Sequence, residues 1–362
     1  MKKRFLAIIL AALFLLSCNK EGQEYSGLNE FEVLDINIDG LSNRDAMDIA
    51  GNMIDRKYPF TTIEYKEEDR IVDEIDLTKA GIKLLAEFRA TDDNIIVLDQ
   101  EDNNIKVIDW EGNLLKSIGK LGSGDMEFKI PTAFCFDEDN KLYYILDNGN
   151  RRIVVIDEAF NFVKNIEVKT FKDKQNGDIF NSIVLYKDKI YLSETFGSEK
   201  TMAIISIDMD GNEKLYDQKF GGILKVVDDK LYAIENHRGF KYGKEVNTSV
   251  GTHEMVIWCP CGDTMYLVKE DGMKKLYDLP TTYNCTDLLK IDGFYYFAGS
   301  TMGYVNIFKD EKGELKYIKS MNKQIKTESG DDSKRLRMQE YKNTIILSDT
   351  WSKKIYIIDL SR

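Results

Sequence analysis

Histidine and proline are scarce in this chain, with two and four copies in 362 residues. The two histidines, His237 and His253, come without paired C-x-x-C knuckles, which argues against a zinc cluster. Segments with helical periodicity are also nearly absent, so a sheet covered by helices is not expected. Neither a G-x-S-x-G elbow nor an H-E-x-x-H motif occurs. These absences leave no familiar catalytic signature.

The chain begins with basic residues, followed by an apolar run of 12 residues from Phe5 to Leu16. This run is too short to cross a bilayer of roughly 30 Å as a helix, and it has the layout of a secretory signal. The four residues from Leu15 to Cys18 resemble the lipobox of bacterial lipoproteins, in which cleavage precedes a cysteine that carries lipid. We therefore expect a signal peptide at 1–17 and lipidation of Cys18; the alternative is an ordinary signal with a coincidental cysteine.

Residues 18–29 are polar and are expected to form a flexible tether to the membrane. Lys20 and Glu21 resemble the charged export signal of surface lipoproteins of Bacteroidetes. This predicts an exported outer-membrane lipoprotein, periplasmic or surface-exposed. Removal of three basic residues with the signal changes the net charge from −12 to about −15, so we expect no nucleic-acid partner and repulsion from anionic headgroups.

Four further cysteines remain after cleavage: Cys135, Cys259, Cys261 and Cys285. An oxidising compartment permits disulfides, but Cys259 and Cys261 are too close for an easy mutual bridge. Cys135 lies in the apolar run "TAFCF", which predicts a buried core residue. The disulfide status of all four stays open.

One phrase, an apolar strand, a polar turn and a second strand, recurs six times along the chain. Its first strands begin near Ile95, Leu142, Ile190, Leu231, Phe294 and Ile345. Their β-branched and aromatic content is typical of strands, and repeats of roughly 40 to 50 residues are typical of propeller blades. The sequence predicts an all-β, six-bladed β-propeller over residues 30–362.

The segment from Ser117 to Asp157 begins with the glycine run "GKLGSG". A phosphate loop of the dinucleotide type must open a helix, whereas two strands follow here. We expect a joint between blades instead, with Phe128 filling the gap and Pro131 fixing the start of the next strand.

This segment resembles an NHL repeat. The matching residues are Gly122, Gly124, Phe128, Pro131, Asp147, Asn150, Arg151, Ile153 and Asp157. With the lipobox, the chain is similar over about residues 60–362 to NHL-like six-bladed propeller lipoproteins of Bacteroidetes. That resemblance implies a fold but no assigned activity.

The final repeat ends close to the C-terminus and lacks an outer strand. Residues 30–40, "EFEVLDINIDG", alternate like a strand and are expected to supply it, so that an N-terminal strand joins the last blade. Between them and the first blade, Ser42 is a candidate N-cap of one short helix, expected to cap the propeller.

The six turns of the repeats should gather on one face, around the mouth of the central channel. Their aromatic and polar side chains suit a glycan, a peptide or a partner protein. The candidate ligand-binding residues are Arg151, Arg152, Phe196, His237, Arg238, Phe240, Tyr304 and Trp351. Polar turn residues also serve hairpin geometry alone. The insertion 236–254 in the fourth repeat should project from the rim and is the strongest single marker of a site.

The alternative is a metal-dependent hydrolase or lyase with its site in the channel. It needs carboxylates and amides from at least three blades, and calcium is the one cofactor considered. An apolar plug in the channel would remove this hypothesis. With 62 acidic residues, no catalytic pair stands out, and we assign none. We favour binding over catalysis.

Overall fold

The computed structural model describes residues 32–35, 37, 42–57, 66–170, 180–194, 203–216, 219–248, 251–259, 264–279, 285–299, 305–321, 336–350 and 352–361. Of residues 32, 33, 43, 47, 54–57, 67, 236–248 and 251–259 it describes the backbone only.

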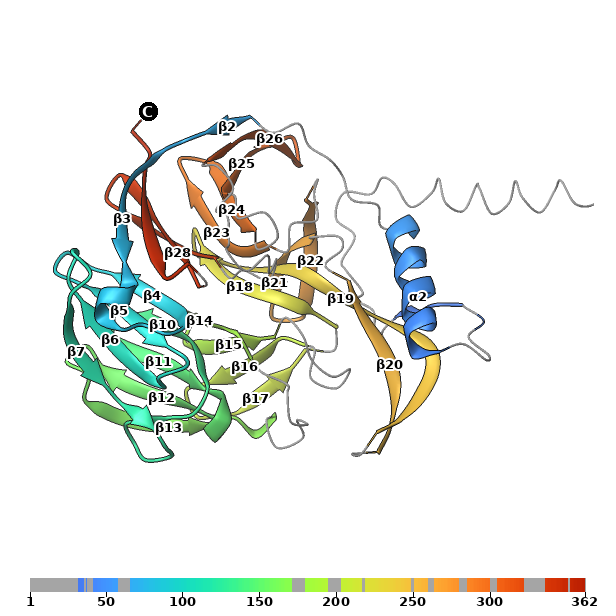
Figure 1. Ribbon diagram of the computed structural model, residues 1–362, viewed down its shortest axis with the longest axis horizontal. Coiled ribbons are helices and arrows are strands. Elements are labelled where there is room, and N and C mark those ends of the chain that lie inside the picture. The colour runs from blue at the N-terminus through green and yellow to red at the C-terminus, as the bar shows by residue number, and fades with distance from the viewer. Residues whose placement is uncertain are drawn as a thin grey trace, which may run out of the picture.

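The described residues form six antiparallel blades around a common axis (Figure 1). Blade 1 comprises β4 (Leu85–Ala90), β5 (Ile95–Asp99), β6 (Asn104–Ile108) and β7 (Leu114–Ile118). Blade 2 comprises β10 (Pro131–Asp137), β11 (Leu142–Asp147), β12 (Arg152–Asp157) and β13 (Phe162–Glu167). Blade 3 comprises β14 (Ser182–Tyr186), β15 (Lys189–Ser193), β16 (Ile205–Asp208) and β17 (Glu213–Leu215).

Of the other three blades, blades 4 and 5 carry additional strands, and blade 6 takes its fourth strand from the N-terminal part of the chain. Blade 4 comprises β18 (Gly221–Val227), the first part of β19 (Lys230–Thr248), β21 (Thr264–Lys269) and β22 (Gly272–Asp278). Blade 5 comprises β23 (Cys285–Ile291), β24 (Phe294–Gly299), β25 (Val305–Glu311) and β26 (Glu314–Met321), with β2 (Glu67–Glu68) at its edge. Blade 6 comprises β27 (Leu336–Tyr341), β28 (Thr344–Asp349), β29 (Lys354–Asp359) and β3 (Ile71–Asp76). The predicted fold class is confirmed, and the repeat positions mark the second strands to within one residue.

The first strand of each blade is the inner one. β10, β14, β18, β23 and β27 contact one another in that order, and β4 contacts both β27 and β10. The ring is therefore closed, and these six strands surround its axis.

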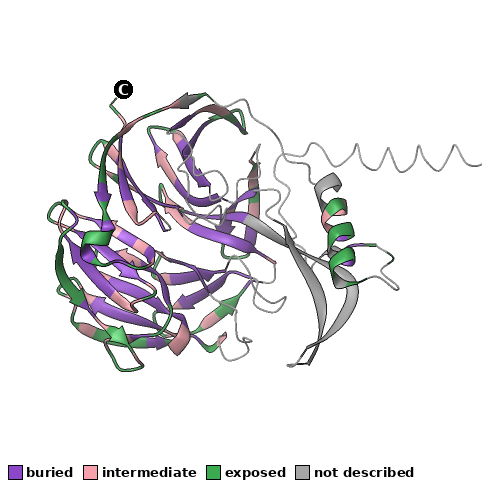
Figure 2. Ribbon diagram, viewed as in Figure 1, coloured by how far each residue is buried: buried purple, intermediate pink, exposed green. Residues whose placement is uncertain are grey.

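Hydrophobic packing between the blades holds the ring together. Six buried clusters occur in the described part of the chain, and each draws residues from two neighbouring blades. Ile96 of blade 1 packs with Tyr143 of blade 2, for example, and Ile346 of blade 6 packs with Ile95 of blade 1. Figure 2 shows buried residues along the strands of every blade. Strands buried on both faces need apolar residues at nearly every position, which explains runs such as "IIVLD".

An N-terminal strand closes the last blade, as predicted, but residues 30–40 do not supply it. β3 pairs antiparallel with β29, with Ile75 opposite Ile355. β1 (Glu32–Val33), the part of 30–40 that the structure shows as strand, instead pairs in parallel with Phe240 and Lys241 of β19. Both segments alternate apolar and polar residues, and this alternation does not specify which blade edge a strand joins. β3 is joined to blade 1 by the single turn η1 (Leu77–Ala80). Because blade 6 is a neighbour of blade 1 in the ring, this short connection places β3 at the edge of blade 6.

The predicted helix exists as α2 (Asn43–Lys57), and Ser42 caps it: Ser42 Oγ accepts a hydrogen bond from the Asp45 amide at 3.2 Å. It does not cap the ring. α2 contacts β20 (Gly251–Cys259), which pairs with the outer part of β19 as a long hairpin beside blade 4 (Figure 1). The insertion thus projects as predicted, but as a continuation of a blade strand. No helix in the described ranges is long and apolar enough to cross a membrane.

The glycine run is a joint between blades 1 and 2, as predicted. Its two short strands, β8 (Lys120–Leu121) and β9 (Glu127–Phe128), pair in parallel. Phe128 is fully buried in the cluster between these blades, and Gly119, at φ 86°, passes so close to its ring that a Cβ would collide. The amides of Ser123 and Gly124 donate to Glu127 Oε2 at 3.1 and 2.9 Å. The loop therefore holds a carboxylate of its own chain.

Candidate functional site at the central channel

The turns between second and third strands lie on one face, where the connection from the previous blade also arrives. Two predicted site residues on this face are described. Arg151 is exposed and adopts the left-handed conformation at φ 58°. Arg152 donates to Asp147 Oδ2 at 2.9 Å and to the carbonyls of Gly124 and Glu127 at 2.7 and 2.8 Å. Arg152 therefore fastens the glycine joint to blade 2.

The side chains of the other predicted site residues lie outside the described part of the structure. Phe196, Tyr304, Trp351 and Cys18 lie outside the described residues. His237, Arg238 and Phe240 lie on the backbone of β19, where the chain leaves blade 4 for the hairpin, and their side chains lie outside the described part. Their roles stay predictions.

The aspartates that end the second strands have a structural role. Asp99 accepts hydrogen bonds from the amides of Lys83 and Leu84 at 2.8 and 3.0 Å and from Lys106 Nζ at 2.8 Å. Asp147 accepts one from the Lys129 amide at 2.7 Å. In both blades the carboxylate thus holds the connection that leads into the inner strand.

A cavity of about 260 Å³ lies on the axis of the ring, among all six inner strands. Its lining includes Glu87, Phe134, Cys135, Phe136, Asn181, Ser182, Leu185, Leu224, Lys225, Thr286, Asp287 and Arg337. Among the described residues, apolar side chains do not fill the channel. Most of its polar residues lie near the N-terminal ends of the inner strands, the ends that meet the turn face.

Lys225 and Asp287 join blades 4 and 5 inside the cavity. Lys225 Nζ lies 2.6 Å from Asp287 Oδ1, and the Asp287 side chain is 4% exposed. The same carboxylate accepts hydrogen bonds from the amides of Leu288 and Met338 at 2.8 and 2.6 Å. Three donors therefore hold this carboxylate in place.

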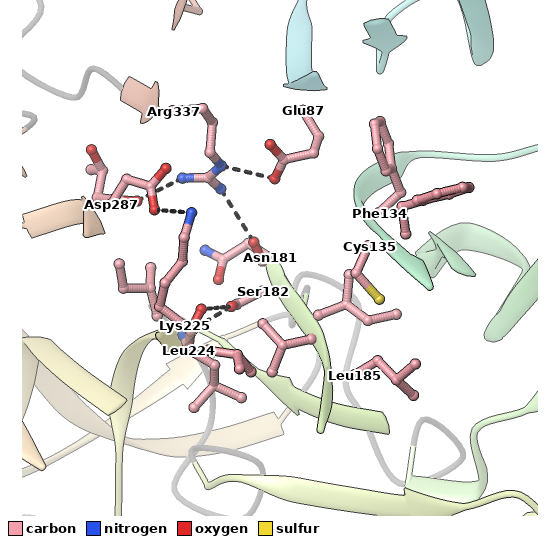
Figure 3. A pocket seen from close by; sticks show the side chains of 16 residues that line it. Glu87, Phe134, Cys135, Asn181, Ser182, Leu185, Leu224, Lys225, Asp287 and Arg337 are labelled. Atoms are coloured by element: carbon pink, nitrogen blue, oxygen red, sulfur yellow. Dashed lines mark hydrogen bonds and ion pairs between the residues drawn. The ribbon is translucent and has the colours of Figure 1, made fainter. Parts of the chain in front are cut away.

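Arg337 of blade 6 is the second cation. Its Nε donates to Glu87 Oε2 of blade 1 at 3.1 Å, and its Nη1 donates to the Thr286 carbonyl of blade 5 at 2.8 Å. Its Nη2 is a more distant 3.4 Å from the Asn181 carbonyl of blade 3. Figure 3 shows the Arg337 guanidinium and the Lys225 ammonium directed toward the same part of the cavity, beside Asp287 and Asn181.

Burial in the channel raises the pKa of Glu87, while the charge of Arg337 opposes this rise and that of Asp287 adds to it. Glu87 accepts a hydrogen bond from the Phe88 amide at 3.2 Å, besides that from Arg337. Its carboxylate is thus held by fewer and longer bonds than that of Asp287. Burial therefore favours the protonated form of Glu87.

Cys135 lies half-buried on the apolar wall of the cavity and packs against the cluster between blades 2 and 3. Burial, aided by the charges of Asp137 and Glu87, raises the pKa of its thiol to about 12. Cys135 and Cys285 form no disulfide with another described residue. Cys135, predicted as a buried core residue, therefore lies at the inner edge of the hydrophobic core and faces the channel.

No group of three or more His, Cys, Asp or Glu side chains suited to a metal ion occurs within the described ranges. Glu87 and Asp287, the two carboxylates among the cavity-lining residues, each pair with a cation.

Reasoning from the sequence missed Glu87, Lys225, Asp287 and Arg337. The available signal was a charge inside a short apolar strand, as in "LAEFRA" and "GGILKVV". The recurring phrase begins at the second strand of each blade, and these charges lie outside it, on the inner strands.

Comparison with known proteins agrees with this architecture. Residues 79–242 match a family described as 6-bladed beta-propeller, and no curated protein matches the chain. Among solved structures, U3-55K is 9% identical with a TM-score of 0.52. The match covers 81% of this chain and 100% of the U3-55K chain. A catalytically inactive virginiamycin B lyase from Staphylococcus aureus, solved with quinupristin, is 13% identical with a TM-score of 0.50, covering 80% and 98%. A putative exported protein from Bacteroides fragilis is 11% identical with a TM-score of 0.49, covering 80% and 86%.

At these identities the structural likeness shows the fold alone. The chain is a six-bladed β-propeller with a polar central cavity, an architecture suited to binding.

Proposed function

We propose that this protein is an exported binding protein, an NHL-like propeller lipoprotein of the Bacteroidetes type. It is anchored to the outer membrane through lipid on Cys18 and recognises a glycan, a peptide or a partner protein at the turn face. One observation carries the binding role: a cavity among all six inner strands that contains two ion pairs, Lys225 with Asp287 and Arg337 with Glu87. A concave site with a few fixed polar groups is the usual form of a ligand site.

The state of the channel groups favours binding over catalysis. Both cations are paired with carboxylates, and the thiol of Cys135, with its pKa raised to about 12, stays protonated at neutral pH. Fixed, paired charges orient a ligand without supplying a nucleophile.

A hydrolase or lyase working in the channel, with calcium as a cofactor, is the second candidate. The observation in its favour is Glu87, because a buried carboxyl with a raised pKa is what general acid catalysis uses. A metal would have to displace the cations that now pair with the channel carboxylates.

The test is a binding screen of the full-length chain, purified in detergent micelles, against a glycan array and a peptide library. Every hit is measured again with Lys225→Met, with Arg151→Ala and with the control Lys290→Met. Lys290 pairs with Asp228 at 2.5 Å and does not line the cavity. We expect hits that weaken with the first two variants and not with the control. Hits that bind all three variants like the wild type would refute the site.

Lipid anchoring and catalysis need separate measurements. Mass spectrometry of the mature N-terminus should find lipid on Cys18, and Cys18→Ser should move the protein from the membrane to the soluble fraction. Turnover of a bound ligand that is lost in Glu87→Gln, and that requires calcium, would favour the enzyme over the binding protein.

A further inference from the structure

We propose that the channel accepts a ligand carboxylate between Lys225 and Arg337. The ligand, or the part of it that enters, is the size of one amino acid or one sugar acid. This inference rests on the proposed function and names the chemistry that the site selects.

The two cations of the cavity, Lys225 and Arg337, keep hydrogen-bond donors that can face a ligand. Lys225 Nζ has three donors and, among the described residues, bonds to Asp287. Arg337 has five donors, and its Nη2 reaches a carbonyl only at 3.4 Å, which is long for a hydrogen bond. The channel carboxylates already accept bonds from lysine, arginine and backbone amides. A ligand that complements the site must therefore present acceptor atoms.

Charge balance favours a monoanion. With both pairs ionised, the channel network is neutral. If Glu87 takes up a proton as the ligand enters, the two cations balance Asp287 and one ligand carboxylate. A phosphate dianion would leave a net negative charge in a buried site, which is costly. A planar carboxylate also matches a guanidinium edge.

The volume limits the ligand to a small group. The cavity volume of about 260 Å³ lies just below the roughly 300–1,000 Å³ of typical ligand pockets. Phe134, Leu185 and Leu224 also line the cavity and supply apolar surface (Figure 3). An amino-acid side chain or the face of one sugar ring can pack there. The carboxylate can thus come from the C-terminal residue of a peptide or from a uronic acid.

Binding should be linked to proton uptake at Glu87. The charged and titratable groups that face Glu87 are Arg337 from β27, Asp287 from β23, Lys225 from β18 and Cys135 from β10. A ligand carboxylate beside Arg337 adds a negative charge near Glu87 and competes for its cation. Both effects favour protonated Glu87, so affinity should fall as pH rises.

The test uses isothermal titration calorimetry on the full-length chain in detergent micelles. The probes are N-acetylalanine and glucuronate, each with its neutral counterpart, N-acetylalaninamide and glucose, and a sulfated monosaccharide. We expect at least one acid to bind about tenfold or more tighter than its counterpart, since bonds to charged groups contribute about 1.5–3 kcal/mol. Binding of N-acetylalanine would indicate that the ligand carboxylate comes from a peptide C-terminus, and binding of glucuronate that it comes from a uronic acid. Binding should be tighter at about pH 5.5 than at about pH 8 and should weaken about tenfold or more in Lys225→Met but not in Lys290→Met.

The wild type alone also gives a decisive readout. Titrations in two buffers of different ionisation enthalpy report proton uptake, which should be positive, and Glu87→Gln should abolish it. Equal binding of neutral counterparts, tighter binding of the sulfated sugar, or no proton uptake would overturn the inference. If the acids fail while hits from the ligand screen still depend on Lys225, the proposed function stands and the carboxylate inference falls.

Discussion

Lys225 Nζ lies 2.6 Å from Asp287 Oδ1, which ties the inner strands of blades 4 and 5 together within the channel. Asp287 also accepts hydrogen bonds from two backbone amides, one of them from Met338 of blade 6. One carboxylate therefore links three of the six blades at the axis. The residues that shape the cavity also support the ring.

Asp287→Asn should lower stability by about 3 kcal/mol, because it leaves an ammonium without its partner in a buried site. Urea denaturation followed by tryptophan fluorescence measures the change. The matched control is Asp228→Asn at the pair with Lys290, where Asp228 is 54% exposed and the loss should stay below about 1 kcal/mol. Equal effects of the two variants would contradict a structural role of the channel pair.

Closure of the ring by β3 can be tested with two substitutions on the same strand. Ile75 is 3% exposed and faces the cluster between blades 6 and 1, whereas Val72 is 60% exposed. Ile75→Ala should cost about 2–5 kcal/mol in the free energy of unfolding, and Val72→Ala should change it by about 0.5 kcal/mol or less. Similar unfolding midpoints for the two variants would argue against this closing strand.

Glu68 should make the stability dependent on pH. Hydrogen bonds from Arg70, at 2.7 Å, and from Lys319 of β26 lower its pKa to about 2, against about 4.3 in an unfolded chain. The folded state is thus favoured by ionised Glu68 above about pH 4.3, and this contribution is lost as the pH falls from about 4.3 to about 2.

Glu68→Gln should therefore unfold at a lower temperature than the wild type at pH 7, and at the same temperature near pH 2. Differential scanning calorimetry at several pH values measures the difference. It should shrink in about 1 M salt, because Glu68 is 40% exposed and screening weakens the pairs. A difference that persists unchanged at pH 2 would contradict the assignment.

Cys135 should resist alkylation. With its pKa raised to about 12, its thiolate fraction at pH 8 is roughly a thousandfold below that of a thiol of pKa about 8.5. Iodoacetamide labelling followed by peptide mass spectrometry measures the rate, with the urea-unfolded chain as control. Rapid labelling of Cys135 in the folded chain would show that the thiol is exposed or activated.

The glycine joint shows how far reasoning from the sequence extends. Two strands after the glycines exclude a phosphate loop, and the burial of Phe128 confirms the predicted joint. The bonds from Arg152 to Gly124 and Glu127 were not foreseen. A turn arginine looks the same in a sequence whether it meets a ligand or a backbone carbonyl, because only the packing of the neighbouring connection decides which acceptor is within reach.

The closing strand shows the opposite case. Residues 30–40 and 71–76 both have strand patterns, and the pattern records which faces are buried, not which neighbour buries them. The choice of β3 depends on its short connection through η1 to blade 1. That distance constraint becomes visible only when the position of blade 1 in the ring is known.

The sequence by itself determined the number and kind of the blades, because each second strand is buried on both faces and must repeat the same apolar run. Only the tertiary structure decided the candidate site. Glu87, Lys225, Asp287 and Arg337 lie on four different blades, and closure of the ring brings them to one cavity. A charge in a strand acquires partners through contacts distant in sequence, and no local pattern encodes those contacts.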